Sequence, residues 1–141
     1  MPQDAPDCIF CRIASGQVPA HTVYQDEHVL GFMDTSPLAD GHLLVIPRDH
    51  YERITDMPPE AIGRLFAQAG RLGGALLQVT GTEGLNVLQN NGRVAGQAVM
   101  HVHVHLIPRR EGDGLGYRWS AGQYPPGRAE QLAGAIKAAL A

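Results

Sequence analysis

Apolar residues recur with a helical period in one long segment of this chain. Between Pro58 and Val79 they return every three to four positions, at Ile62, Leu65, Phe66, Ala69, Leu72 and Leu76. This single apolar stripe predicts one long amphipathic helix. Thr55 or Asp56 is a candidate cap for it, and prolines suit the first turn of a helix.

Short apolar runs elsewhere predict strands, bounded by turn residues such as those of Thr35–Gly41. Short helices are predicted at residues 8–15 and at Arg128–Leu140. This order predicts an α+β domain, with an antiparallel sheet of about five strands and the helices on one face. A free sheet edge could pair with a second copy. The predicted strands are Val23-Tyr24, Val29–Met33, His42–Ile46, Leu85–Gln89 and Val99–Ile107.

Composition narrows the class of protein. The 141 residues are 44% hydrophobic and 18% charged, which is typical of one globular domain spanning 1–141. A net charge of −3 argues against a dedicated nucleic-acid binder or a protein of anionic membrane surfaces. No apolar run reaches the roughly 18 residues of a membrane span, and no signal peptide is expected. Two cysteines without an export signal favour a cytoplasmic location.

The strongest chemical signal is a row of alternating histidines. In a strand, His101, His103 and His105 would share one face, roughly 6.6 Å apart, with valines and a leucine on the other face. Three interpretations compete: a solvated strand face, a three-histidine metal site, or nucleophilic and acid–base chemistry at phosphorus. A straight row of ligands cannot converge on one ion, which counts against the metal site.

The segment before this row favours chemistry at phosphorus. Asn90–Gln97 is polar and contains Gly92 and Gly96, which allow backbone N–H groups to approach an anion closely. The chain has no Walker-type phosphate loop, and its one lysine, Lys137, lies far from any glycine-rich loop. Any phosphate must therefore be bound by His, Arg, Asn and backbone groups.

Several motifs, in order and spacing, resemble the histidine-triad nucleotide-binding family, and the tail is most similar to its bacterial Hit-like branch. The resemblance covers a core of about residues 8–109, with a tail and helix at 110–141. The motifs are Cys8-Ile9-Phe10-Cys11-Arg12-Ile13, Val23-Tyr24, Asp34-x-x-Pro37, Gly41–Arg48-x-His50, Asn90-Asn91-Gly92, Ala95-Gly96-Gln97 and His101-x-His103-x-His105-Leu106-Ile107-Pro108-Arg109.

The resemblance implies a homodimer whose sheets join across the subunits, and chemistry at the α-phosphate of an adenosine nucleotide. His103 would be the nucleophile that forms a covalent nucleotidyl-histidine, and His105 would bind the phosphate and assist the leaving group. His42 matches a fourth family histidine that supports the site.

The resemblance also implies the binding residues. Asn90 and Gln97 would lie at the phosphate, and Asp34 would hold the ribose hydroxyls, as suits an acceptor-only carboxylate. Alternatively, Asp34 is an ordinary turn residue. Ala98 departs from the family, in which many members have Ser or Thr as a phosphate donor, so substrate preference is open. Apolar residues around the base would be Phe10, Ile13 and Phe32, with plain core packing as the alternative.

A Cys-x-x-Cys pair alone is a weak zinc signal. By the resemblance, a structural Zn²⁺ would be held by Cys8, Cys11, His50 and His101, a closed set that leaves no position for water. This would remove His101 from the chemistry.

The substrate expected first is a dinucleoside polyphosphate, with Mg²⁺ as a possible companion, and second an adenosine phosphoramidate. Two other classes stay open. One is a nucleotide-binding interaction module with little catalysis, and the other is a metal-dependent hydrolase that uses the histidine row directly.

Overall fold

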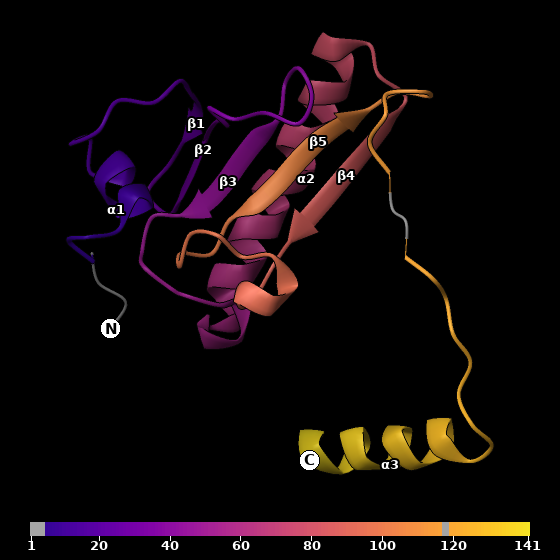
Figure 1. The fold of residues 1–141 in the computed structure, drawn as a ribbon. Coiled ribbons are helices and arrows are strands. Elements are labelled where there is room, and N and C mark those ends of the chain that lie inside the picture. Colours follow the sequence, from indigo (N-terminus) through magenta and orange to yellow (C-terminus); the bar gives the residue numbers. More distant parts are fainter. Residues whose placement is uncertain (1–4, 117–118) are drawn as a thin grey trace.

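A five-stranded antiparallel sheet forms the centre of the protein, as the computed structural model shows for residues 5–116 and 119–141 (Figure 1). The strand order is β1-β2-β3-β5-β4, so β1 and β4 are the two edges. The α+β class and the five strands are confirmed. The strands are β1 (Thr22–Gln25), β2 (Val29–Met33), β3 (Leu43–Pro47), β4 (Gly84–Gln89) and β5 (Val104–Arg109).

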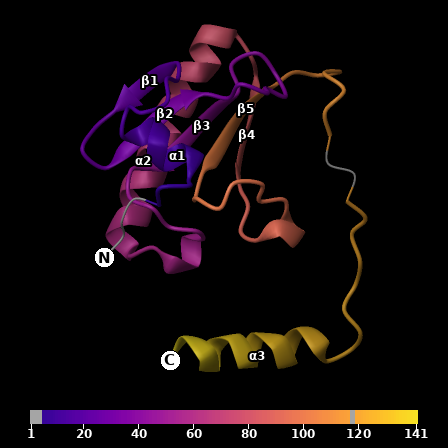
Figure 2. The same ribbon diagram turned by 60° about the vertical axis from the view of Figure 1, so that its left-hand side comes forward.

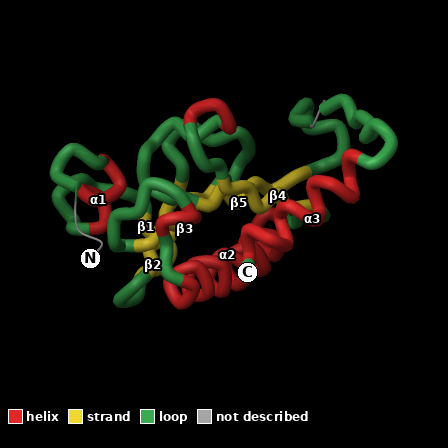
Figure 3. The backbone as a smooth tube through the Cα atoms, turned by 90° about the horizontal axis from the view of Figure 1, so that it is seen from below, coloured by secondary structure: helices red, strands yellow, loops and turns green. Residues whose placement is uncertain are grey.

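One face of the sheet is covered by the long helix α2 (Pro59–Thr80), which runs along one side of the strands (Figure 3). Its buried Leu65 and Ala69 pack with alternate residues of the strands, among them Val45 and Leu106. The predicted cap is wrong, because Pro58 is the N-cap and makes no side-chain bond. Asp56 ends a short 3₁₀ turn instead and accepts a hydrogen bond from the Arg53 amide.

The opposite face carries the short helix α1 (Ile9–Ala14). Phe10 of this helix packs on the other set of alternating strand residues, which are Leu30, Phe32, Leu44 and Ile46. The prediction that the helices share one face is therefore wrong. Period-two alternation makes both faces of β2 and β3 apolar, and each face needs its own cover.

Strand β5 begins at Val104, five residues later than predicted. His101 and His103 therefore precede the strand, and only His105 lies in it. The alternation nevertheless holds, because Val102 and Val104 are fully buried in the core under α2. The histidines are left on the α1 face of the sheet.

The helix α3 (Arg128–Leu140) has the predicted bounds but stands apart from the sheet (Figure 2). None of its residues is buried. Within the described residues, no helix is both long and apolar enough to span a membrane.

Candidate active site

A cavity of about 510 Å³ opens on the α1 face of the sheet, beside the histidines. This volume lies in the range of small-molecule sites. The wall combines apolar side chains from α1 and β2 with polar side chains, among them Asp34, His103 and His105. Seven of the residues predicted from the sequence line it together: Phe10, Ile13, Phe32, Asp34, Ala98, His103 and His105.

A backbone carbonyl fixes the tautomer of His103. The Nδ1 of His103 lies 2.7 Å from the carbonyl oxygen of His101, which can only accept a hydrogen bond. Nδ1 therefore carries the proton, and Nε2 keeps its lone pair. An imidazole nitrogen with a free lone pair in a nucleotide-sized cavity is a competent nucleophile.

A second backbone group fixes the tautomers of His42 and His105. The Leu38 amide donates to Nδ1 of His42 at 3.0 Å, so the proton of neutral His42 lies on Nε2. That Nε2 is 2.9 Å from Nδ1 of His105 and donates to it. His105 therefore carries its own proton on Nε2.

Burial keeps these imidazoles neutral. Burial, together with the neighbouring His103 and His42, lowers the pKa of His105 to about 4, although the Asp34 carboxylate opposes this shift. Burial also lowers the pKa of His42 and of His103, while the Asp34 carboxylate opposes this in both. At neutral pH the site thus holds an unprotonated Nε2 on His103 and a proton-bearing Nε2 on His105.

Asp34 is a turn residue that also lines the cavity, and its contact with a ribose stays a prediction. Its Oδ1 accepts a hydrogen bond from the Ser36 amide at 2.8 Å, which is a turn interaction. Its Oδ2 lies 3.5 Å from Nε2 of His42, and the residue also lines the cavity. The carboxylate can therefore accept further hydrogen bonds from a ligand without leaving its turn.

Aromatic rings border His103. The ring of Phe10 meets that of His103 edge to face, with centroids 5.1 Å apart, and Phe32 at 5.6 Å. Phe10 and Phe32 also belong to the core beneath α1. These residues therefore belong to the core and also form one wall of the cavity, and their contact with a base stays a prediction.

The structure does not bring the side chain of Gln97 to the cavity. It is buried, donates to the carbonyls of Glu52 and Val99, and accepts from the Gly92 amide. These bonds brace the loop before the histidines. Asn90 lies in the same loop, with its side-chain amide close to Gly96.

Four predicted metal ligands lie close together at the N-terminal end of α1. Ligand atoms of Cys8, Cys11, His50 and His101 all lie within 4.8 Å of one another. Nδ1 of His101 is 3.4 Å from Sγ of Cys8, 3.5 Å from Sγ of Cys11 and 3.2 Å from Nδ1 of His50. A tetrahedral zinc site separates its ligand atoms by about 3.3–3.8 Å. The donor set and its spacing therefore fit zinc.

A hydrogen bond on the far side of the His101 ring also supports a metal site at this cluster. Nε2 of His101 donates to the carbonyl of Pro47 at 2.8 Å, so Nδ1 of the neutral ring is unprotonated. This Nδ1 faces the other three ligands. Metal-bound histidines commonly use their second nitrogen in this manner. His101 is thereby turned away from the reaction, while its carbonyl orients His103.

The sequence matches one family across the segment that carries these residues. Residues 15–112 match the HIT domain. The chain belongs to the HIT family. A relative in Methanocaldococcus jannaschii, an uncharacterized HIT-like protein, is 50% identical over 76% of this chain and 82% of its own length. The Hit protein of Bacillus subtilis is 41% identical over 97% of both chains.

Two solved structures are similar to this one over most of the chain. A crystal structure from Streptococcus mutans covers 100% of this chain and 90% of its own, with 38% identity and a TM-score of 0.95. A zinc-bound histidine triad protein from Mycobacterium smegmatis covers 94% and 97%, with 38% identity and a TM-score of 0.75.

Two further relatives have names that describe an activity. An adenosine 5'-monophosphoramidase of Candida albicans is 40% identical over 81% of this chain and 78% of its own. An adenylylsulfatase of Arabidopsis thaliana is 39% identical over 77% of this chain and 55% of its own.

In this HIT chain, sequence reasoning missed two supporting groups. The backbone amide of Leu38 sets the histidine tautomers, and backbone roles leave no trace in residue type. Asn91 accepts from the Ile54 amide at 2.7 Å and exchanges side-chain hydrogen bonds with Gln89. The Asn90-Asn91-Gly92 motif contained that second residue, but its position alone did not reveal the partner.

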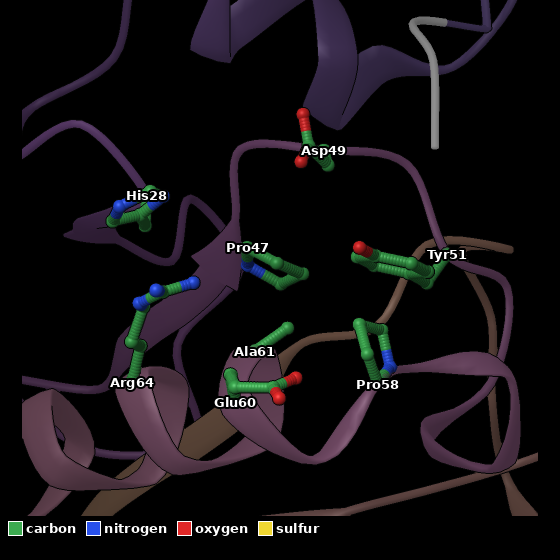
Figure 4. Close-up of a pocket in the computed structure, with 8 residues that line it drawn as sticks. All are labelled: His28, Pro47, Asp49, Tyr51, Pro58, Glu60, Ala61 and Arg64. Carbon is green, nitrogen blue, oxygen red and sulfur yellow. The ribbon is translucent and has the colours of Figure 1, made fainter. Parts of the chain in front are cut away.

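A second, smaller cavity lies at the start of α2 and shares no residue with the first (Figure 4). It measures about 90 Å³, too small for a nucleotide. Charges of both signs border it, so it favours no ligand class. Its lining is His28, Pro47, Asp49, Tyr51, Pro58, Glu60, Ala61 and Arg64.

Proposed function

We propose that this protein hydrolyses adenosine nucleotides at the α-phosphorus through a covalent nucleotidyl-histidine on His103. The observation that carries the proposal is the tautomer of His103, which leaves Nε2 unprotonated on a residue that lines the 510 Å³ cavity. The apolar side chains that line this cavity suit a base, and Asp34 suits the ribose hydroxyls.

In the first step, Nε2 of His103 attacks phosphorus and the bond to the leaving group breaks, its electron pair departing with that group. The Nε2–H of His105 donates a hydrogen bond to the phosphate or to the leaving atom, where negative charge develops. Asn90 does not line the cavity, and by the family resemblance alone it would stabilise the phosphate oxygens together with backbone amides of its loop. In the second step, water attacks phosphorus, releases a proton and frees His103.

The substrate class is narrowed by the two relatives named for an activity. One name describes a phosphoramidase of adenosine 5'-monophosphate and the other an adenylylsulfatase. Both favour an adenosine 5'-monophosphate derivative with a small leaving group over the dinucleoside polyphosphates expected first. Mg²⁺ receives no support, since the Asp34–His42–His105 group offers mainly nitrogen and Mg²⁺ prefers oxygen.

The zinc proposal is structural. Cys8, Cys11, His50 and His101 would hold Zn²⁺ as a closed set, and bound zinc would stabilise the fold at that point without activating water. Within this cluster, the group that contributes to the proposed chemistry is the backbone carbonyl of His101, which orients His103.

We further propose a homodimer through the free edge of β4. This strand carries no charge and no proline, which would otherwise protect an edge. The other edge strand, β1, is short and its pairing is irregular, which makes it a poor template.

The test compares wild type and His103→Ala on adenosine 5'-phosphoramidate and on diadenosine tetraphosphate, with and without EDTA. Turnover should survive brief EDTA treatment and fall about 10³-fold or more in the variant, because the nucleophile is lost. AMP binding should persist in the variant. Near-wild-type turnover by His103→Ala would rule out the covalent mechanism. AMP binding without wild-type turnover would favour the interaction module.

A further inference from the structure

A further cavity, of about 380 Å³, borders the proposed zinc ligands. Cys8 and His50 line it, whereas Cys11 and His101, which also belong to the described chain, do not. The proposed chemistry takes place in the neighbouring 510 Å³ cavity and does not use these two residues. Two of the four ligands are therefore within reach of a small molecule that enters this second space.

The two cysteines differ in how far they can be reached. Cys8 is half-buried and borders the cavity, whereas only 3% of Cys11 is exposed. A reagent in the cavity therefore meets Cys8 first. Zinc ligation requires the thiolate form of cysteine, and the thiolate is also the form that reacts with oxidants. The side chain that holds the metal at this edge is thus also the one open to oxidation.

Cys11 is placed to complete such a reaction. The sulfur atoms of Cys8 and Cys11 lie within 4.8 Å of each other, and the Cys11 amide donates to Sγ of Cys8 at 3.4 Å. A disulfide needs about 2.0 Å between its sulfur atoms. Cys8 is the N-cap of α1 and has an extended backbone, so a small movement where α1 begins closes this gap. Cysteines that sense oxidants often have a second cysteine this close.

The charge of the cavity narrows the class of oxidant. Asp7 and Glu52 border it, both are exposed, and its described lining includes no lysine or arginine. Two carboxylates repel an anionic oxidant such as glutathione disulfide, whereas a neutral hydroperoxide is unaffected. The cavity therefore favours a hydroperoxide.

We propose that Cys8 is a site of reversible oxidation by hydrogen peroxide, with Cys11 as the resolving cysteine. The Cys8 thiolate attacks one peroxide oxygen, the O–O bond breaks, and its electron pair leaves with hydroxide. The Cys11 thiolate then attacks the sulfur of the Cys8 sulfenic acid, an S–S bond forms, and a second hydroxide leaves. The two cysteines lose two electrons in total, and the peroxide gains them.

Oxidation would also remove both thiolates from the proposed zinc set, and this consequence rests on the proposed zinc site. Two histidines alone do not make a structural zinc site, so the ion is released. Helix α1 then loses its link to His50 and His101. Because α1 carries Phe10 and Ile13 of the 510 Å³ cavity, the disulfide should weaken nucleotide binding, and reduction in the presence of zinc should restore it.

The test adds hydrogen peroxide to the reduced, zinc-loaded full chain. A chromophoric chelator measures released zinc, and alkylation followed by intact mass counts the remaining thiols. We expect one zinc released and one disulfide formed per chain, both reversed by dithiothreitol and zinc. The dissociation constant for AMP should rise about threefold or more in the oxidised protein.

Two variants test the order of attack. Dimedone, which traps sulfenic acids, should label Cys8 in Cys11→Ser. It should label Cys11 in Cys8→Ser at least about tenfold more slowly, because Cys11 is buried. Each variant lacks one zinc ligand, so the comparison between them is matched.

A third variant tests the cavity while the cluster stays intact. Glu52→Gln removes one of the two carboxylates and keeps the backbone carbonyl that Gln97 contacts. It should speed oxidation by glutathione disulfide roughly two- to fivefold and leave oxidation by hydrogen peroxide unchanged. Glu60→Gln, at an exposed position outside this cavity, is the matched control and should change neither rate.

Three results would overturn the inference. They are thiols that persist under peroxide, equal dimedone labelling of Cys8 and Cys11, and faster oxidation of wild type by glutathione disulfide than by hydrogen peroxide. An AMP affinity that stays the same after disulfide formation would overturn the coupling to the nucleotide cavity. A reduced protein that binds no AMP would count against the proposed function alone, because thiol counts and zinc release do not depend on nucleotide.

Discussion

The reactivity of this site depends on which nitrogen of each imidazole carries the proton. Two backbone groups decide it: the carbonyl of His101 for His103, and the amide of Leu38 for His42 and then His105. Both groups belong to the main chain, so the decision survives side-chain variation nearby. The fold itself thus sets His103 and His105 in opposite tautomers.

The hydrogen bond from His42 to His105 can be tested by replacing His42 with each of the two amide residues. A Gln at position 42 can place its amide N–H where Nε2 lies and still donate to His105, whereas Asn reaches only the Nδ1 position near Leu38. We expect kcat of His42→Gln to stay within about tenfold of wild type and that of His42→Asn to fall about 10²-fold. Equal losses in both variants would show that the donor bond to His105 is unimportant. AMP affinity serves as the control for folding.

The pKa of His105 predicts an acid-sensitive fold. Folding lowers that pKa from its ordinary value near 6.5 to about 4, so the unfolded chain binds more protons between these pH values. The free energy of unfolding should therefore fall as the pH drops from about 6.5 to 4, by up to about 1.4 kcal/mol per pH unit for one group. Urea denaturation of wild type and His105→Asn measures this. The same slope in both proteins would contradict it.

At the scale of elements, the sequence predicted the helices and the five strands because period and turn residues are local. The start of β5, the cap of α2 and the cover of the second sheet face were wrong, since each depends on packing between distant segments. The site residues were likewise predicted where the signal is local and missed where it depends on packing. Seven cavity residues and four candidate metal ligands came together, while the bracing role of Gln97 needed the three-dimensional loop.

Two neighbouring glycines of α2 give a matched test of its packing. A Cβ at Gly73 would lie 2.7 Å from a methyl carbon of Leu85, whereas at Gly74 it would meet nothing within 4 Å. Gly74→Ala should raise the free energy of unfolding by up to about 1 kcal/mol, because Ala has the higher helix propensity. Gly73→Ala should lower it by about 1–3 kcal/mol through overpacking. Urea denaturation of both variants decides, and equal effects would refute the close contact.

At the scale of the whole molecule, the cysteine–histidine cluster joins three segments that are distant in sequence. Cys8 and Cys11 flank and enter α1, His50 follows β3, and His101 precedes the reactive histidine. The ring of His101 contacts the two cysteines, and its carbonyl accepts a hydrogen bond from His103. His101 therefore connects the N-terminal helix to a residue that lines the cavity. Helix α3 formed where the sequence predicted it, but it buries no residue, and local periodicity could not show that it would stand apart from the sheet.

Zinc should therefore act on stability more than on chemistry. Wild type should retain one zinc per chain through dialysis, as measured by elemental analysis, and Cys11→Ser should lose it, because its thiolate lies 3.4–3.5 Å from the two histidine nitrogens. The midpoint of thermal unfolding should fall in Cys11→Ser, since removal of the ion leaves α1 without its link to His50 and His101. Ser15→Ala, at the exposed end of the same helix, is the matched control and should keep both zinc and midpoint.

Turnover per folded molecule of Cys11→Ser should decline far less than that of His103→Ala, because the carbonyl that orients His103 belongs to the backbone. Metal-free wild type with an unchanged unfolding midpoint would exclude the zinc site, and a loss of turnover as deep as that of His103→Ala would place the metal in the chemistry itself.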